Sequence, residues 1–300
     1  MKQHKLNYCF TMMVILLMML NISEAKSQFA QCDYFGLKTP GTTPQEFNPS
    51  VLNLKGFIFN GAFSPKCDEF YFTRVNSKEN IYRSKKVNGA WQSPEVVSFS
   101  DRNFNDADPF FDPRGKRVYF ISSRPIGASQ QSNVYNIWYA ERKGDDWSKP
   151  VALPSPINTE NNEYFFSVSN KGNAFFASNR AGGKGSFDFY QLKVSKNGKM
   201  SKPQNMGNPI STKGYEFDPH ISLDESFMVY SVNDDQGASD LYFSYKDNKG
   251  NWTKGISLGD QVNVSRADFA PSLTPDNRYI IYTNNGKLMW VSVDLLESLK

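Results

Sequence analysis

One motif, repeated five times, restricts the fold of this chain more than any other feature of its sequence. An aromatic residue ends an apolar segment at Phe72, Phe120, Phe176, Tyr230 and Tyr282. The intervals between these residues are 48, 56, 54 and 52 residues. A fixed period near fifty residues indicates that one supersecondary unit packs against copies of itself. We therefore expect a repeat-built architecture.

Each repeat contains four short segments, which the second repeat shows most clearly. Its first segment, residues 108–116, leads into Asp, Pro and Gly residues that favour a tight hairpin. An apolar strand at 118–120 and a polar-apolar-aromatic segment at 136–138 follow. The fourth segment has Trp147 with Pro150 three residues later. Because proline cannot donate to a sheet ladder, this strand is expected at the outer edge, as in a β-propeller blade.

The predicted fold class is all-β, a single β-propeller of four-stranded antiparallel blades. Five repeats predict five blades, and six remain an alternative if a long connection such as 127–133 hides another unit. The fifth repeat ends after its third strand. Residues 49–53 match residues 94–98, which belong to the fourth strand of the first repeat. We therefore expect the N-terminal segment to complete the last blade and close the ring, which also removes an unpaired sheet edge.

Residues 1–27 differ from the rest of the chain and are typical of a secretory signal peptide. Lys2 and Lys5 precede an apolar run at 10–20, and Ser23-Glu24-Ala25 offers a small-x-small cleavage site. The run is too short to cross a bilayer of about 30 Å as a helix, although an uncleaved membrane anchor is the alternative. The sequence thus predicts export to the periplasm or the extracellular space.

The predicted mature chain, a propeller domain over residues 28–300, is weakly basic and has no expected transmembrane span. Cleavage after Ala25 removes two lysines and one glutamate, which changes the formal charge from +4 to 32 minus 29, or +3. Nucleic-acid binding needs a concentrated basic face and is not expected. Two cysteines remain, and export permits a disulfide between Cys32 and Cys67, with two free buried thiols as the alternative.

Two stretches of this repeat resemble a known family. Residues 108–120, with Asp-Pro-Arg-Gly-Lys at the turn, and residues 178–190, with Ser-Asn-Arg-Ala-Gly-Gly, are similar to the WD-like β-propeller repeat of the TolB type. The resemblance covers roughly residues 35–294. It implies an exported propeller, most often in a bacterial envelope, that presents a surface or funnel to a partner. It implies no single activity, since propellers host many functions.

Five carboxylates lie near the start of the first strand of their repeats: Asp108, Glu163, Glu216, Asp218 and Asp268. Equivalent points of a propeller converge on one rim of the central channel, so these groups are predicted to approach one another there. A pair of them would suit glycoside hydrolysis, and a ring would suit Ca²⁺. Because every repeat has a similar residue, the favoured interpretation is that each carboxylate caps backbone N–H groups of its own turn.

Basic side chains also recur at related positions. Arg74, Arg124 and Arg180 follow the second strand, where they would bind a carboxylate, sulfate or acidic glycan bidentately, although solvated ion pairs between blades are favoured. His220 has no motif-marked nucleophile and no second histidine in the mature chain, so a structural or rim position is expected. The predicted ligand-binding residues at the channel rim are Asp108, Arg124, Arg180, Asp218, His220 and Asp268, with no catalytic or metal-ligating residue assigned.

The absence of a motif-marked catalytic set favours an interaction module over an enzyme. Such a propeller, expected to be a monomer without a cofactor, would bind an envelope or secreted protein, or a glycan, through one face. The alternative is a hydrolase or lyase that acts on acidic glycans through channel carboxylates and arginines. A sensor for a small ligand or a metal is the third hypothesis.

Overall fold

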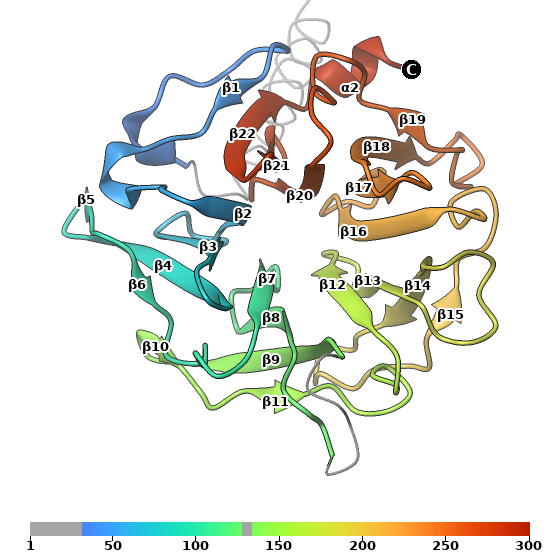
Figure 1. The fold of residues 1–300 in the computed structure, drawn as a ribbon, viewed down its shortest axis with the longest axis horizontal. Coiled ribbons are helices and arrows are strands. Elements are labelled where there is room, and N and C mark those ends of the chain that lie inside the picture. The colour runs from blue at the N-terminus through green and yellow to red at the C-terminus, as the bar shows by residue number, and fades with distance from the viewer. Residues whose placement is uncertain (1–31, 128–133) are drawn as a thin grey trace, which may run out of the picture.

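The computed structural model of this chain describes residues 32–127 and 134–300. The predicted signal peptide over residues 1–27 lies outside these ranges. Five antiparallel sheets surround a central axis, each turned edge-on to it like the blade of a propeller (Figure 1). The prediction of five blades is confirmed, and the six-bladed alternative is wrong.

The blades follow one another along the chain. Blade 1 contains β2 (Phe57–Phe63), β3 (Glu69–Val75), β4 (Glu79–Val87), β5 (Ala90–Trp91) and β6 (Glu95–Val96). Blade 2 contains β7 (Asp106–Phe111), β8 (Arg117–Ser122), β9 (Asn136–Lys143), β10 (Asp146–Trp147) and β11 (Val151–Ala152). Blade 3 contains β12 (Glu163–Val168), β13 (Asn173–Ser178), β14 (Asp188–Lys193) and β15 (Gln204–Asn205), and blade 4 contains β16 (Tyr215–Ile221), β17 (Phe227–Asn233), β18 (Ser239–Tyr245) and β19 (Ile256–Ser257). Blade 5 contains β20 (Asp268–Leu273), β21 (Tyr279–Asn284), β22 (Lys287–Ser292) and β1 (Gln45–Glu46).

The recurring aromatic residues occupy the second strand of every blade. Phe72, Phe120, Phe176, Tyr230 and Tyr282 are at most 3% exposed. Each packs against the preceding blade, while the residue before it in the strand packs against the following blade. Both faces of the second strand are therefore covered, which explains why these strands read as nearly continuous apolar runs. Apolar packing between adjacent blades, rather than within one sheet, therefore forms most of the core.

The outermost strand of each blade is only two residues long and pairs with the third strand. Pro94, Pro150 and Pro203 stand directly before β6, β11 and β15. Each of these short strands pairs on one side only, with β4, β9 and β14. The predicted edge position of the proline-marked strand is confirmed.

The N-terminal segment closes the ring, but with residues other than those predicted. In β1, Gln45 pairs with Trp290 of β22, and the Phe47 N–H donates to the Leu288 carbonyl at 2.8 Å. The prediction that residues 49–53 form this strand is wrong, because the 3-10 helix η2 (Ser50–Leu52) lies there. Pro49 lacks an N–H for a ladder, and the chain turns after it to bury Leu52.

An arm that precedes β1 ties blade 5 to blade 1. The structure joins Cys32 to Cys67, in the β2–β3 turn, through a disulfide. In the 3-10 helix η1 (Tyr34–Gly36), the Tyr34 hydroxyl donates to Asp276 Oδ2 at 2.6 Å in the β20–β21 turn. At the other end of the chain, the helix α2 (Leu295–Ser298) packs Leu296 against blades 4 and 5. Within residues 32–127 and 134–300, no helix has the length and apolarity that a membrane crossing requires.

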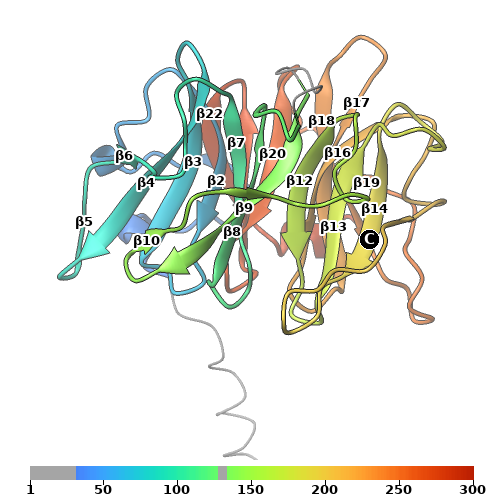
Figure 2. The same cartoon turned by 90° about the horizontal axis from the view of Figure 1, so that it is seen from below.

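The propeller has two distinct faces, seen side-on in Figure 2. The hairpin face carries the turns between the first and second strands of each blade, and Tyr34 lies there beside Asp276. The loop face, uppermost in Figure 2, carries the connections between second and third strands, such as those from β3 to β4 and from β17 to β18. Each face has a cavity at the axis.

Candidate functional site

All five inner strands contain a β-bulge at the same position. In β7, Ala107 pairs with Ile121 and Phe110 pairs with Tyr119, so Asp108 and Pro109 together oppose Phe120. One residue of each bulge has a positive φ, namely Asn60, Asp108, Phe165, Asp218 and Ala270. Asparagine and aspartate enter this region more readily than most residues. The bulges divide the axial channel, so that a cavity lies on either side of them.

The larger cavity opens on the loop face and has a volume of about 530 Å³. We call it the loop-face funnel. All five blades contribute to its lining, and its walls are two groups of aromatic rings. One group is Phe57, Phe59 and Phe269, and the other is Tyr135, Tyr164, Phe187 and Phe217. Asp108, Asp218, Glu79 and Ser239 supply polar groups, and Arg266 lies in the same lining.

Asp108 and Asp218 are the two predicted site residues that the structure brings together in this funnel. Asp108 is 5% exposed, and its carboxyl has no hydrogen bond or ion pair with any described residue. Its backbone N–H donates to Thr73 Oγ1 at 3.3 Å. Asp218 Oδ2 accepts from Ser231 Oγ at 3.0 Å and from the Ala270 N–H at 3.1 Å.

Burial sets the protonation of this pair. It raises the pKa of Asp218 to about 6, against the hydrogen bonds from Ser231 and Ala270 that favour the charged form. Burial raises the pKa of Asp108 well above its usual range, and the negative charges of Asp218 and Glu79 raise it further. Each carboxyl therefore takes up a proton more readily than an exposed aspartate, and the charge of one affects the ionisation of the other.

Three further polar side chains of the funnel lining, Glu79, Ser239 and Arg266, were not predicted from the sequence. Glu79 Oε2 accepts from the Tyr135 hydroxyl at 2.9 Å, and burial raises the pKa of Glu79. The Ser239 hydroxyl is buried in the funnel wall without a hydrogen-bond partner among the described residues. Arg266 is exposed, and its Nη2 donates to the Gln236 carbonyl at 3.1 Å.

Arg124 and Arg180 do not line the funnel but form buried ion pairs. Arg124 Nη2 contacts Asp106 Oδ2 at 2.7 Å, and Arg180 Nη2 contacts Glu163 Oε1 at 3.2 Å. Both guanidinium groups also bond backbone carbonyls of the connection that enters their blade, those of Phe99 and Ile157. Solvated ion pairs between blades were the favoured interpretation, but both pairs lie within one blade and are largely buried.

Glu163, Glu216 and Asp268 also have structural roles. They accept from the N–H groups of Thr159, Thr212 and Ser265, at 3.0, 3.1 and 2.7 Å. Their equivalent in blade 2 is Asp106, which accepts from the Asp101 N–H at 2.7 Å. The sequence analysis placed Asp108 in this series, but the equivalent residue of blade 2 is Asp106, two positions earlier. The five predicted carboxylates therefore do not share one rim: Glu163, Glu216 and Asp268 cap backbone N–H groups, whereas Asp108 and Asp218 line the funnel.

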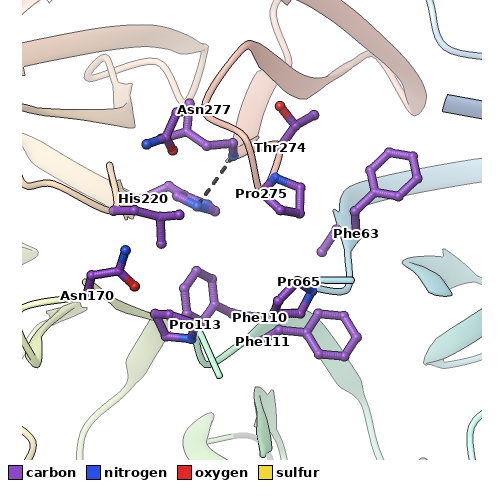
Figure 3. Close-up of a pocket in the computed structure, with 13 residues that line it drawn as sticks. Phe63, Pro65, Phe110, Phe111, Pro113, Asn170, His220, Thr274, Pro275 and Asn277 are labelled. Atoms are coloured by element: carbon purple, nitrogen blue, oxygen red, sulfur yellow. Dashed lines mark hydrogen bonds between the residues drawn. The ribbon is translucent and has the colours of Figure 1, made fainter. Parts of the chain in front are cut away.

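His220 lies in the second cavity, at the hairpin face. This cavity of about 430 Å³ is surrounded by Pro65, Pro113 and Pro275 from three hairpin turns (Figure 3). His220 Nε2 accepts from the Leu273 N–H at 3.4 Å, and burial lowers the pKa of His220 to about 3. The ring is therefore neutral and connects blade 4 to blade 5, on the far side of the bulges from Asp108.

The funnel aromatics also escaped the sequence analysis, although a signal for them exists. The residue before each bulge is Phe59, Ala107, Tyr164, Phe217 or Phe269, and all five line the funnel. Four of these five are aromatic. Aligning the five first strands on the bulge would have identified them. Among the described residues, no group of three or more His, Cys, Asp or Glu side chains is placed to hold a metal ion.

Comparisons with solved structures show the same architecture in proteins of different kinds. TolB from Acinetobacter baumannii superposes with a TM-score of 0.50 at 14% identity, over 78% of this chain and 53% of that one. The α-L-arabinofuranosidase from Lactobacillus brevis also has a TM-score of 0.50 and 14% identity, over 80% and 91% of the two chains. The shared feature is the propeller fold. This chain spans only about half of the TolB chain's length. No protein-family profile and no curated relative matches the sequence.

Proposed function

We propose that this protein is an exported, TolB-like propeller that binds a saccharide in the loop-face funnel without cleaving it. The observation that supports this function most directly is the lining of the funnel, in which aromatic rings from all five blades surround buried polar groups. Its volume of about 530 Å³ is within the range of small-molecule sites, roughly 300–1,000 Å³.

The chemistry of the lining suits a sugar. Aromatic rings pack against the apolar C–H faces of a pyranose, and the carboxylate of Asp218 and the hydroxyl of Ser239 accept from its hydroxyl groups. The TolB-type resemblance also implies protein partners. A concave site of about 530 Å³ at the axis favours the end of a glycan chain or a small ligand over a flat protein interface.

Export is part of this proposal. It is supported by the signal-peptide pattern at residues 1–27 and by the Cys32–Cys67 disulfide, which an oxidising compartment permits. The corresponding ligand is a glycan of the cell envelope or of the extracellular medium, and the propeller is proposed to act as a monomer.

Substitution of the funnel aromatics tests the proposal. Wild-type protein, Tyr164→Ala and Phe217→Ala are screened against a panel of envelope oligosaccharides by calorimetry. We expect each substitution to weaken binding at least tenfold, about 1.4 kcal/mol, because each removes a ring from the wall. Tyr215→Ala is the matched control, since Tyr215 is 37% exposed and lies outside the funnel lining. Equal losses in all three variants, or none, would reject the funnel as the binding site.

A second candidate function, glycoside hydrolysis, is favoured by one specific observation. Asp108 and Asp218 line the same funnel, and burial raises the pKa of both carboxyls. A pair of carboxyl groups, one acting as the acid and one as the base or nucleophile, is what glycoside hydrolysis requires. Turnover of a polysaccharide by wild-type protein that disappears in both Asp108→Asn and Asp218→Asn would establish an enzyme in place of a binding protein.

A further inference from the structure

The loop-face funnel has more negative groups than it can neutralise. Asp108, Asp218 and Glu79 all line it, and Arg266 is the one cationic side chain in the described part of its lining. The guanidinium of Arg266 is exposed and bonded to the Gln236 carbonyl. Glu79 has Tyr135 as its donor, and Asp218 has Ser231 and Ala270. Asp108 is left without a donor or a cation among the described residues.

Asp108 is also the group for which this lack matters most. At 5% exposure its carboxyl is nearly removed from water, yet it remains part of the funnel lining. An ionised carboxylate buried without a partner is strongly unfavourable, so burial favours a proton on Asp108. A ligand that brings a positive charge would replace this proton and provide the missing counter-charge.

The walls around Asp108 are suited to the same kind of ligand. Phe59, Tyr164, Phe217 and Phe269 precede the bulges, and all four line the funnel. Aromatic rings attract ammonium groups within about 6 Å of their centroids. The Ser239 hydroxyl, which is 7% exposed and has no partner in the described chain, is free to accept from an N–H donor.

We propose that the loop-face funnel selects saccharides that carry a free, protonated amine, with the ammonium group bound by the carboxyl of Asp108 between the aromatic walls. This inference rests on the proposed function, because it specifies the class of saccharide that the same funnel takes. Amino sugars with an unsubstituted amine fit it. Their N-acetylated counterparts keep the ring and lose the charge.

Binding of the ammonium group favours ionisation of the carboxyl pair. The titratable groups that face Asp108 are Asp218 from β16, Glu79 from β4 and Tyr164 from β12. Burial and the nearby carboxylates raise the pKa of Tyr164, which therefore stays neutral. Because the raised pKa values of Glu79 and of the carboxyl pair oppose their ionisation, an amine that keeps its charge binds more tightly as a rising pH ionises these groups.

Two matched pairs of probes test the inference by calorimetry. The first pair is a glucosamine trisaccharide and its fully N-acetylated form, both at pH 6. The second is n-butylammonium and n-butanol at pH 7, where an alkylamine is protonated. We expect the charged member of each pair to bind at least tenfold more tightly. In Asp108→Asn this preference should fall below threefold, while Asp235→Asn, an exposed acid of the loop face outside the funnel lining, should keep it.

The outcomes separate the two proposals. Equal or tighter binding of the N-acetylated trisaccharide would overturn the amine preference and leave saccharide binding standing. Binding of n-butylammonium alone would support the ammonium site and overturn saccharide binding. Binding of none of the four probes would overturn both for this class of ligand. If Asp108→Asn does not fold, Asp218→Asn replaces it, since an amide oxygen there still accepts from Ser231 and Ala270 while the charge is lost.

Discussion

At the scale of the residue, Asp106 and Asp108 show how one bulge gives neighbouring carboxylates unrelated roles. In a regular strand, residues two apart share a face. The bulge in β7 begins after Ala107, so Asp106 turns to Arg124 while Asp108 turns to the axis. Similar residue types two positions apart were therefore indistinguishable in the sequence, although only one of them reaches the funnel.

The stability of the protein should depend on the pH through Asp108. Because its pKa is raised in the folded state, the folded protein binds more protons than the unfolded chain above about pH 4, and stability falls as the pH rises from there. Asp108→Asn removes this loss. We expect the variant to gain about 1–3 kcal/mol over wild type at pH 8, and almost nothing at pH 4.

Urea unfolding of both proteins at the two pH values measures this difference. The comparison uses the variant minus wild type, because Glu79, Asp106, Glu163 and Glu216 also have raised pKa values. A gain of the same size at pH 4 and pH 8 would contradict the assignment of a buried, protonated carboxyl at Asp108.

The ion pair between Arg124 and Asp106 should be costly to break. The Asp106 side chain is 0% exposed, so Arg124→Leu leaves a buried carboxylate without its cation. We expect a loss of about 3–5 kcal/mol in the free energy of unfolding at pH 7. The control is Glu141→Ala, which breaks the exposed pair with Arg117 at 2.7 Å and should cost at most about 1 kcal/mol. Equal losses in the two variants would show that burial does not determine the contribution.

At the scale of the element, the sequence predicted the strands that recur in each blade but missed the features that depend on how neighbouring strands pair. The second strands and the proline-marked edges recur with fixed chemistry, because burial between blades and the missing proline N–H constrain them locally. The bulges are shifts of register between two strands, and no residue pattern within one strand reports them. For that reason the funnel aromatics could be aligned only once the position of the bulges was known. Glu79 and Ser239 begin the third strands β4 and β18, and no repeated pattern marks them.

The closing strand illustrates the same limit. Residues 49–53 resemble 94–98, but Pro49 precedes the 3-10 helix η2, whereas Pro94 precedes the strand β6. The pairing with β22 is made earlier in the chain, by Gln45 and Glu46, which have no apolar signature. Ring closure itself was predictable because the fifth repeat lacks a fourth strand.

Phe47 should be the most sensitive position of this closure. Its ring is 0% exposed and packs against Phe63, Phe70 and Trp290. Phe47→Ala is expected to lower the free energy of unfolding by about 3–5 kcal/mol, measured by urea denaturation. Val151→Ala, in the outer strand β11 where the side chain is 48% exposed, should change it by less than about 0.5 kcal/mol. A small effect at Phe47 would mean that the ring does not need the N-terminal segment.

At the scale of the whole molecule, the five blades form one body with a separate cavity at each end of its axis. The bulge residues separate the loop-face funnel, with Asp108 and Asp218, from the hairpin-face cavity, with His220. The ring is closed twice, by the β1–β22 ladder and by the Cys32–Cys67 disulfide. The ladder acts in the folded state, and the disulfide also restricts the unfolded chain.

Removing the disulfide should therefore lower global stability without changing the funnel. The two cysteines are 35 residues apart, and a cross-link of that span typically contributes about 2–4 kcal/mol. We expect the double variant Cys32→Ser, Cys67→Ser to lose that amount in guanidinium unfolding under oxidising conditions. Its affinity for funnel ligands should match that of wild type. Unchanged stability would show that the β1–β22 ladder alone determines closure.

The position of this disulfide also determines how the propeller would respond to a mechanical load. β1 and β22 run antiparallel with the start of one beside the end of the other, a geometry in which tension on the two chain ends peels the pair apart one bond at a time. Tension applied at Cys32 does not reach β1, because it passes through the sulfur atoms directly to the β2–β3 turn of blade 1. The β1–β22 pair is thus bypassed, and force applied at Cys32 would be borne by blade 1.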